Sequence, residues 1–397
     1  MDHTGNTAIA HWGEHCNGGG ERVAWDLART FDAPLFVGSK DPDIGPDDIS
    51  SEAISKDGVL QRLVDHGGVG QMIGYQFLWE KAAPLRDFEI VITSGNEPLA
   101  YVPPDGQTWI AYIHHTSRYA TDLLEQAVSK ISGPLEGPKK IAFRGIRKAE
   151  RHIYSSYAQK PDRIVVNSEV VARRVRRYWG VPKQNISVVY PAVNVEKYSR
   201  TLAETDDIYL SLSRLDGHKR IDEVVTAFSQ HPNKTLVVAG DGSERGRLEK
   251  IAPDNVKFVG YVSESEKRQL MSRAKGFVVN AEAEDFGITT VEALASGTPV
   301  IGVREGFTEY LVGEERGVTY VRGELSDALY RIDRDGVQWT EEEIENFADR
   351  FSFERFAREM RGIVSKVQRE NKIVTPWGEG GRDEISREQL QQDGNIK

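Results

Sequence analysis

Two glutamates in the stretch AEAEDFGITTVEALASGTPVIG, residues 281–302, could bind a polar ligand. Glu284 and Glu292 have seven residues between them, and Gly287 lies in that gap. The flanking apolar runs predict two buried strands, with a short helix over residues 290–296 between them. A loop carboxylate, a glycine and an exposed helix N-terminus together suit a ligand that carries phosphate, and a carboxylate accepts hydrogen bonds from sugar hydroxyls. Glu284 is therefore a candidate binding residue.

Glu292 has a second, purely structural interpretation. Thr289 stands three residues before it, which fits the S/T-x-x-E capping box. In that case Glu292 would brace the start of the helix. The capping box explains neither Glu284 nor Gly287, and a residue in the first turn could do both jobs.

Two cations lie in the stretch SLSRLDGHKRIDEVV, residues 211–225. Arg214 and Lys219 flank a loop between a predicted strand and a predicted helix. Two cations at the carboxyl end of a parallel strand can clamp a diphosphate. The alternative is a pair of solvated surface charges, but the position at the strand end and the turn at Gly217 favour a functional role.

Two glycine-rich turns follow predicted strands. Gly18, Gly19 and Gly20 lie in CNGGGERVAWDLAR, and Gly240 and Gly242 lie in VVAGDGSERGRL. Glycines let backbone amides approach a ligand closely, and a helix N-terminus favours an anion. No dinucleotide-binding fingerprint is met, because the spacing is not GxGxxG. The alternative for both segments is a simple turn.

The segment YIHHTSRYATD follows another predicted strand. His114, His115, Arg118 and Tyr119 would lie where the carboxyl end of that strand meets a crevice between domains, the usual ligand site of such sheets. Adjacent histidines on a strand point to opposite faces, so they cannot easily share a metal ion. A single histidine that reaches a substrate hydroxyl is the better interpretation, and we expect no metal site.

The elements that would position these candidate residues form two series in which predicted strands alternate with predicted helices. In the first half the strand candidates are TAIAHWG, APLFVGS, FEIVITSG, TWIAYIHH, DRIVVNS and ISVVYPAV; in the second half they are DIYLSLSRL, TLVVAGDG, VKFVGY, GFVVNAE and TPVIGVR. Such continuous apolar runs are typical of strands buried on both faces of a parallel sheet. Helical patterns such as GERVAWDLARTF, SEVVARRVRRYWG and RIDEVVTAFSQ lie between them. The predicted fold class is α/β, with two doubly wound Rossmann-like domains facing each other across a cleft.

The polar stretch around residue 198 predicts the domain boundary. We expect a first domain over residues 1–198 and a second domain over residues 199–366, ending in the amphipathic helix SFERFAREMRGIVSKVQ. Residues 367–397 are polar and rich in glycine, which predicts a weakly ordered tail.

Composition excludes several classes of protein. The chain has 397 residues, 39% hydrophobic and 28% charged, and a net charge of −10, which argues against a general affinity for nucleic acid. We find no secretory signal peptide and no apolar run long enough to span a membrane. Cys16 is the only cysteine, so no internal disulfide can form, and a single thiol fits a reducing cytoplasm.

A local basic run, GPKKIAFRGIRKAERHIY, stands out against this acidic background. One interpretation is a solvated helix face. The other is a patch that lies near anionic lipid or a phosphate-bearing acceptor.

Several of these motifs together resemble a known family. EDFGITTVE is similar to the E-x7-E signature of the retaining GT-B glycosyltransferases, in particular glycosyltransferase family 4. SRLDGHKRIDEVVTAF resembles the R-L-x-x-x-K segment of that family, and GGGERVAWDLA resembles its N-terminal G-G-x-E-R loop. VVNSEVVARRV and YPAVNVEKY follow in the expected order, so the resemblance runs from about residue 9 to about residue 366.

The resemblance implies that the domain over residues 1–198 is the acceptor side and the domain over residues 199–366 is the donor side. Arg214 and Lys219 would hold the donor diphosphate, Glu284 would contact the donor sugar, and Glu292 would bind the ribose. The remaining donor-binding residues that we predict are Gly19, Gly20, Gly242, Phe286, Gly287, Ile288 and Thr289.

The resemblance also implies an acceptor side. YIHHTSRYATD is similar to the family segment Y-x-H-T-P-x-R-Y, which makes His114 the family histidine and places Arg118 and Tyr119 near the acceptor. His115, Thr116 and Ser117 replace the usual T-P-x, and residues 192–194 depart from the family's N-G-V-D. These departures concern the choice of acceptor more than the donor chemistry.

The implied activity is a metal-independent, retaining hexosyl transfer without a cofactor. The donor would be a nucleoside-diphosphate sugar, with GDP-mannose or a related hexose favoured, and the acceptor a glycan or a polyprenyl-linked glycan. Such an enzyme would be cytoplasmic, with peripheral contact at the membrane face. The alternatives are a sugar-nucleotide 2-epimerase with the same fold and a non-catalytic partner subunit; a nicotinamide dehydrogenase is disfavoured because the dinucleotide fingerprint is missing.

Overall fold

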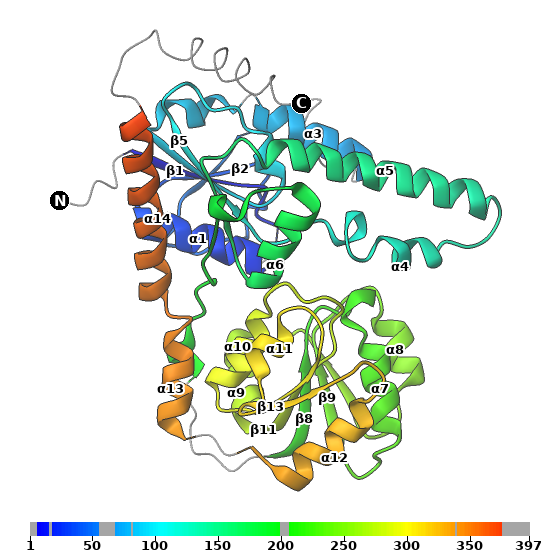
Figure 1. Cartoon of the computed structure of the whole chain (residues 1–397). Coiled ribbons are helices and arrows are strands. Elements are labelled where there is room, and N and C mark those ends of the chain that lie inside the picture. Colours follow the sequence, from blue (N-terminus) through cyan, green and yellow to red (C-terminus); the bar gives the residue numbers. More distant parts are fainter. Residues whose placement is uncertain are drawn as a thin grey trace, which may run out of the picture.

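The computed structural model describes residues 6–15, 18–54, 68–80, 82–198, 206–337 and 340–374, so Cys16 lies outside the described residues. Two parallel sheets, each flanked by helices, form two lobes (Figure 1). The predicted α/β class with two doubly wound units is confirmed. No helix of the described segments is long and apolar enough to cross a membrane.

The first lobe contains seven parallel strands in the order β3-β2-β1-β4-β5-β6-β7. These strands are β1 (Thr7–His11), β2 (Leu35–Val37), β3 (Ser51–Ala53), β4 (Ile90–Ser94), β5 (Thr108–Ile113), β6 (Arg163–Val166) and β7 (Ile186–Val188). Every residue of β1, β4 and β5 is buried. This is why the apolar runs in the sequence located them. The short edge strand β3 was not predicted, because its SEA sequence carries no apolar run.

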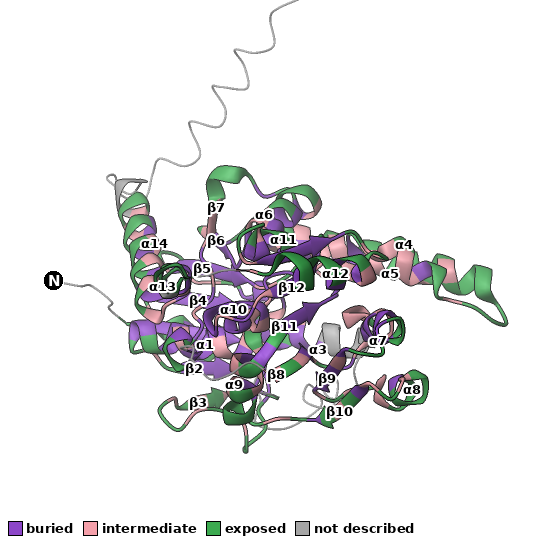
Figure 2. Ribbon diagram, turned by 90° about the horizontal axis from the view of Figure 1, so that it is seen from below, coloured by how far each residue is buried: buried purple, intermediate pink, exposed green. Residues whose placement is uncertain are grey.

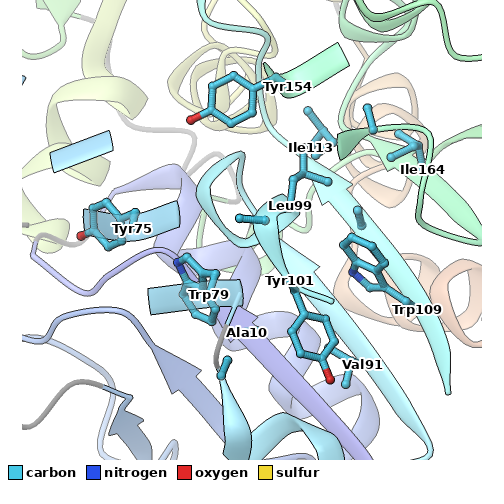
Figure 3. Packing of buried hydrophobic residues seen from close by; sticks show 14 of the residues in the cluster. Ala10, Tyr75, Trp79, Val91, Leu99, Tyr101, Trp109, Ile113, Tyr154 and Ile164 are labelled. Atoms are coloured by element: carbon cyan, nitrogen blue, oxygen red, sulfur yellow. The ribbon is translucent and has the colours of Figure 1, made fainter. Parts of the chain in front are cut away.

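Helices cover both faces of this sheet. They are α1 (Gly19–Phe31), α3 (Gly68–Glu80), α4 (Leu124–Ser129), α5 (Glu136–Tyr157) and α6 (Glu169–Arg174), and α6 continues as the π-helix η4 (Val175–Trp179). The connecting 3-10 turns are η1 (Ala83–Asp87), η2 (Glu97–Ala100), η3 (Arg118–Ala120), η5 (Lys183–Asn185) and η6 (Val195–Tyr198). On one face, Trp79, Tyr101 and Trp109 pack with aliphatic side chains of the sheet (Figure 3).

The second lobe contains six parallel strands in the order β10-β9-β8-β11-β12-β13. They are β8 (Asp206–Leu212), β9 (Thr235–Ala239), β10 (Val256–Gly260), β11 (Ala274–Val279), β12 (Val300–Val303) and β13 (Gly317–Tyr320). The helices are η7 (Gly217–Lys219), α7 (Ile221–Ser229), α8 (Arg245–Ile251), α9 (Glu264–Arg273), α10 (Ile288–Ala295), α11 (Thr308–Val312), α12 (Leu325–Asp335) and α13 (Glu341–Asp349). Strand β13 was the second strand that sequence analysis missed, because Thr319 interrupts its apolar residues Val318 and Tyr320.

The last helix, α14 (Phe353–Val374), returns to the first lobe. Its apolar face, made of Phe356, Met360, Val364 and Val367, is buried against α1 and the first sheet, and Figure 1 shows it running beside the first lobe. Sequence analysis placed residues 353–366 in the second domain, but they pack on the first. The predicted tail also begins too early, because residues 367–374 are helical; residues 375–397 lie outside the described residues.

Helices α4 and α5 project from the first lobe as a hairpin (Figure 1). The basic run of the sequence, residues 137–154, forms most of α5. From Ser129 to Ala149 no residue is buried, and Figure 2 shows this tip as mainly exposed.

Candidate functional site

Lys219 and Glu284 meet where the strands of the second lobe end. Lys219 closes η7 after β8, and Glu284 precedes α10 after β11. The Lys219 Nζ lies 2.7 Å from Oε2 of Glu284, and the side chains are 20% and 13% exposed. The ion pair joins two candidate residues that are 65 positions apart in the sequence.

A positive field surrounds the Glu284 carboxylate. Burial alone would raise its pKa, but the Lys219 ammonium and the Arg118 guanidinium outweigh burial and lower the pKa to about 2. Burial, together with Lys219 and Arg118, also lowers the pKa of His218 to about 4. Glu284 is therefore ionised at neutral pH, while the neighbouring His218 is neutral.

The backbone around Glu284 is held in an unusual conformation. Ala283 has a φ of 50°, in the left-handed region that non-glycine residues avoid. Gly306 packs against the backbone of Glu284, since a Cβ at Gly306 would lie 2.1 Å from the carbonyl oxygen of Glu284. The Phe307 N–H donates to that same oxygen at 2.8 Å. The loop after β12 thus supports the loop that carries Glu284.

The N-terminus of α10 lies beside Glu284, and the N-terminus of α1 contacts Ile288, the first residue of α10. Helix α1 follows the N-cap Gly18, and helix α10 follows the N-cap Gly287; neither has a side-chain cap. A Cβ on Gly19 would lie 2.8 Å from Cδ1 of Ile288, so the two helix starts touch. First-turn N–H groups without helical partners, together with the helix dipoles, favour an anion at this place.

The capping-box interpretation of Glu292 is wrong. Helix α10 begins at Ile288, not after Thr289, and its N-cap is Gly287 with a φ of 90°. Thr289 lies inside the first turn, where its side chain does not cap the helix.

Glu292 instead belongs to a buried charge cluster that joins the lobes. It is 1% exposed, and its Oε1 accepts from Lys267 at 2.9 Å and from Arg22 of α1 at 3.2 Å. Glu264 completes the cluster, 2.8 Å from Arg22 and 3.0 Å from Lys267. The Oε2 of Glu292 is buried and has no hydrogen-bond partner among the described residues. This oxygen retains its capacity to accept a hydrogen bond, but a ligand hydroxyl would reach it only after neighbouring side chains moved.

A cavity of about 580 Å³ adjoins this charge cluster. Its lining comes from both lobes and includes Arg22, Trp25, Tyr198, Glu264, Arg268 and Glu292. Ile288 also lines it, so the cavity reaches the start of α10. A volume of this size accommodates a small polar molecule.

His114 lies at the end of β5 in a network with His11. Its Nε2 is 2.8 Å from Oγ of Ser94, and its carbonyl accepts from Asn167 at 2.8 Å. The Nδ1 of His11 is 2.9 Å from the Ser94 carbonyl, so this nitrogen carries a proton. Burial lowers the pKa of His11 to about 3, and burial with His11 and His115 lowers the pKa of His114. Both imidazoles are neutral at pH 7.

The two imidazoles face the glycine turn of α1. A Cβ on Gly20 would lie 3.6 Å from Cε1 of His11 and 3.9 Å from Cδ2 of His114. The Nε2 of His11 is buried and has no hydrogen-bond partner among the described residues. The glycine turn and His114, predicted separately, are therefore neighbours.

Arg118 connects the lobes. It donates to the Glu282 carbonyl at 2.9 Å and pairs with Asp285 at 3.0 Å. Arg174 of α6 also pairs with Asp285, which is 6% exposed. Arg118, predicted on the acceptor side, is thus held against the second lobe, whereas Tyr119 is 46% exposed.

Arg214 is not brought to Glu284. Its side chain is 77% exposed, and its ion pair among the described residues is with Asp216 at 3.6 Å. Gly242 lies against the same loop, since a Cβ there would be 2.6 Å from the carbonyl oxygen of Leu215. Gly242 therefore has a packing reason to be glycine, whatever its part in binding.

The side chain of Phe286 points into the core. It is 3% exposed and lies with its ring centroid 5.6 Å from that of Phe307. Its backbone, next to Gly287, remains at the start of α10.

Sequence reasoning missed several residues of this region: His11, Arg22, Ser94, Glu264, Lys267, Asp285 and Gly306. The position of Arg22, one turn after the glycine segment, could have indicated that it shares the α1 N-terminus. Glu264 and Lys267 pair with each other within one helix turn, but their contacts with Arg22 and Glu292, like the partners of the other residues, are remote in sequence. Among the described residues, no group of three or more His, Cys, Asp or Glu is placed to hold a metal ion.

Two protein-family models match the chain. The model described as Glycosyltransferase Family 4 matches residues 17–197, and the model described as Glycosyl transferases group 1 matches residues 194–334. The two matches meet where the first sheet ends and the second begins.

Curated relatives match parts of the chain. Alpha-monoglucosyldiacylglycerol synthase of Streptococcus pneumoniae is 28% identical over 174 residues, which is 42% of this chain and 38% of that protein. A lipopolysaccharide core biosynthesis glycosyltransferase of Rhizobium meliloti is 28% identical over 187 residues, 45% of this chain and 54% of that protein. The matches thus cover about half or less of the length of these relatives.

Solved structures share the fold across nearly all of the chain. Anabaena HepE in complex with UDP and glucose has a TM-score of 0.67 at 16% identity, covering 91% of this chain and 100% of that chain. Sucrose-phosphate synthase from Thermosynechococcus elongatus also has a TM-score of 0.67, at 17% identity and with 92% and 100% coverage.

Proposed function

The chain belongs to the group 1 glycosyltransferases of the GT-B fold, and on that premise we propose that it transfers a hexose from a nucleoside-diphosphate sugar to a glycan acceptor. The observation that carries this proposal is the convergence of the Lys219–Glu284 pair with the uncapped starts of α1 and α10. A cation and two helix N-termini suit a diphosphate, and a carboxylate suits sugar hydroxyls.

The donor would lie along the second lobe, from Glu284 toward Glu292. The sugar would contact Glu284, and the diphosphate would lie between Lys219 and the helix N-termini, with Arg214 turning in from solvent. The free Oε2 of Glu292 would accept from a ribose hydroxyl, and the adjoining cavity of about 580 Å³ would receive the nucleoside. UDP and glucose in the HepE structure support a nucleotide-sugar donor for this fold.

The reaction would be a retaining transfer without a metal. Cleavage of the anomeric C–O bond sends its electron pair to the leaving phosphate oxygen, where Lys219 and the helix N-termini stabilise the growing charge. The acceptor oxygen would attack from the same face and form the new bond to the anomeric carbon, while its proton passes to the leaving phosphate oxygen. Glu284 would balance the positive charge of the sugar, and the neutral His114 would orient a sugar hydroxyl.

The acceptor we favour is a lipid-linked glycan at a cytoplasmic membrane face, with a mannose-type hexose as the transferred sugar. Two curated relatives, named for monoglucosyldiacylglycerol and for lipopolysaccharide core, support a lipid-bearing acceptor. Because a lipid-linked acceptor stays in the membrane, the enzyme would have to contact the membrane surface to reach it.

A panel of nucleotide sugars in thermal-shift measurements tests the donor. We expect one nucleoside-diphosphate hexose to raise the melting temperature, since a ligand that binds only the folded state stabilises it. Incubation of that donor with polyprenyl-phosphate-linked acceptors should then yield a glycosylated lipid. A C2 epimer formed from the donor alone would replace the proposal with an epimerase, and no response to any nucleotide sugar would contradict it.

Lys219→Ala tests the assigned chemistry. We expect turnover to fall on the order of 10²–10³-fold, as for loss of one charge partner of the transition state. Lys250→Ala, on the exposed end of α8, is the control and should keep its activity. If Lys219→Ala keeps wild-type turnover with the donor found above, Lys219 does not stabilise the leaving diphosphate.

A further inference from the structure

The hairpin of α4 and α5 leaves one helix face without a partner. Helix α5 has 22 residues, a length of about 33 Å at 1.5 Å per residue. Its C-terminal half is anchored to the first lobe, where Glu150 and Tyr154 are buried. Its N-terminal half projects from the body, and nothing from Ser129 to Ala149 is buried (Figures 1 and 2).

An apolar arc faces solvent on the projecting half. At 100° per residue, Ile141 and Ile146 bound an arc of about 140°. Between them on this arc lie Pro138, Ala142, Gly145 and Ala149, and toward the anchored half of the helix also His152 and Ile153. Ile141 is 72% exposed and Ile146 is 43% exposed, and Leu135, just before the helix, is 72% exposed. A face of this kind marks an interaction site, because exposed aliphatic side chains gain free energy when they leave water.

A basic arc runs beside the apolar one. Within about 100° of the helix circumference lie Lys140, Arg144, Arg147, Lys148 and Arg151. Helix α5 carries six Lys and Arg residues against two Glu residues, although the whole chain has a net charge of −10. Arg144 pairs with Glu125 at 2.6 Å, but both side chains are at least 45% exposed, and such pairs exchange readily with other anions.

We propose that this hairpin docks on the surface of an anionic lipid bilayer, with the apolar arc in the headgroup region and the basic arc on lipid phosphates. A bilayer is a partner that is anionic at its surface and apolar just beneath, which matches the two adjoining arcs. Nucleic acid would satisfy the cations but would leave the isoleucines in water. This inference names the structural element behind the proposed membrane contact, and it stands without the proposed reaction.

The docked hairpin would place the candidate site near the membrane. Gln126 of α4 donates to Oε1 of Glu282 at 2.5 Å, two residues before Glu284. The base of the hairpin therefore touches the loop that carries the donor-side carboxylate. A lipid-borne acceptor held at the bilayer surface would reach the cleft from this side.

Flotation of the full chain with vesicles tests the docking. The vesicles contain phosphatidylcholine alone or phosphatidylcholine with an equal part of phosphatidylglycerol. We expect binding to the anionic vesicles only, weakened when salt rises from about 0.05 M to about 0.5 M. The double variant I141S/I146S should bind at least about tenfold less, as should K148E/R151E.

Ile251→Ser is the matched control, because Ile251 is an isoleucine of the second lobe with 46% exposure. It should bind anionic vesicles like the wild type. Nucleotide-sugar thermal shifts in each variant show that the fold and donor site persist, so a failure of docking is distinguishable from a failure of the proposed reaction.

Three outcomes would overturn the docking. The first is no binding to anionic vesicles at low salt. The second is equal loss of binding in I141S/I146S and Ile251→Ser. The third is a wild-type dimer that dissociates in I141S/I146S while vesicle binding is unchanged, which would make a second copy of this chain the occupant of the arc.

Discussion

At the residue scale, three carboxylates of the site each form ion pairs with different cations. Glu284 pairs with Lys219, Asp285 pairs with Arg118 and Arg174, and Glu292 pairs with Arg22 and Lys267. Three acidic residues of one short segment therefore do three different jobs. Asp285 connects the lobes, Glu284 pairs with a cation of the second lobe, and Glu292 keeps one buried oxygen without a hydrogen-bond partner among the described residues.

Glu292→Gln should weaken nucleotide binding by about 10- to 100-fold, the usual effect of losing a hydrogen bond to a charged acceptor. Titration calorimetry with the nucleotide of the preferred donor measures it. Glu264→Gln is the comparison, since it disturbs the same ion pairs but leaves the Glu292 carboxylate in place. Unchanged affinity in Glu292→Gln, with only a lower melting temperature, would limit Glu292 to a structural role.

The lowered pKa of Glu284 predicts a pH effect on stability. A carboxyl with a lower pKa in the folded state stabilises that state above the unfolded value, and the contribution is lost as the pH falls from about 4.5 toward 2. We expect the difference in unfolding free energy between wild type and Glu284→Gln to shrink between neutral pH and about pH 3. Urea unfolding at both pH values measures this, and a difference that stays constant would contradict the ion-paired state of Glu284.

At the element scale, loops at strand ends hold the site through backbone contacts. The loop after β12 crosses the loop after β11 so closely that only hydrogen fits at Cα of Gly306. The starts of α1 and α10 touch through Gly19 and Ile288 in the same way. Glycines here permit close approach of elements, in addition to any contact with a ligand.

Gly306→Ala should both destabilise the protein and lower its activity. The new methyl group would meet the Glu284 backbone at 2.1 Å, and the φ of 63° already disfavours alanine. Gly336→Ala is a matched control, because its φ is 65° and no atom lies within 4 Å of the added Cβ. We expect turnover to fall in Gly306→Ala alone, while both variants lose about 1 kcal/mol or more to backbone strain. Equal turnover in the two variants would show that Gly306 does not position Glu284.

At the scale of the whole molecule, buried ion pairs hold the lobes together on both sides of residues 282–292. Arg118 and Arg174 bind the start of this segment, and Arg22 binds its end. Helix α14 adds a third connection, since it follows the second lobe in sequence and packs on the first. The observed arrangement is therefore one in which both lobes contribute side chains to a single region.

Arg174→Ala should destabilise the chain by about 2–4 kcal/mol, because it leaves Asp285 buried with one cation fewer. Chemical denaturation measures the free energy of unfolding. Arg173→Ala, at the neighbouring position of the same helix, is the control: Arg173 is exposed, and its contact is the ring of Tyr310 at 5.9 Å. A loss of stability as large in Arg173→Ala would mean that the buried pair is not the cause.

The sequence by itself determined the strands, the fold class and the principal candidate residues. Buried parallel strands appear as continuous apolar runs, so the strands with such runs were located, and short β3 and β13 were not. Lys219, Glu284 and the glycine turns stood out because strand ends are where ligands bind in such sheets. These signals are local, and local patterns can be read without knowing which segments pack together.

Only the tertiary structure decided which charges meet and which faces remain exposed. Arg22 and Glu292 are 270 positions apart, and Arg174 and Asp285 are 111 apart, so no sequence pattern links them. The same limit misplaced α14, whose amphipathic pattern shows that one face is buried but not against which sheet. It also left two interpretations of the basic run, a solvated helix face or a patch for anionic lipid, and the exposed Ile141 and Ile146 are the observation on which the docking proposal rests.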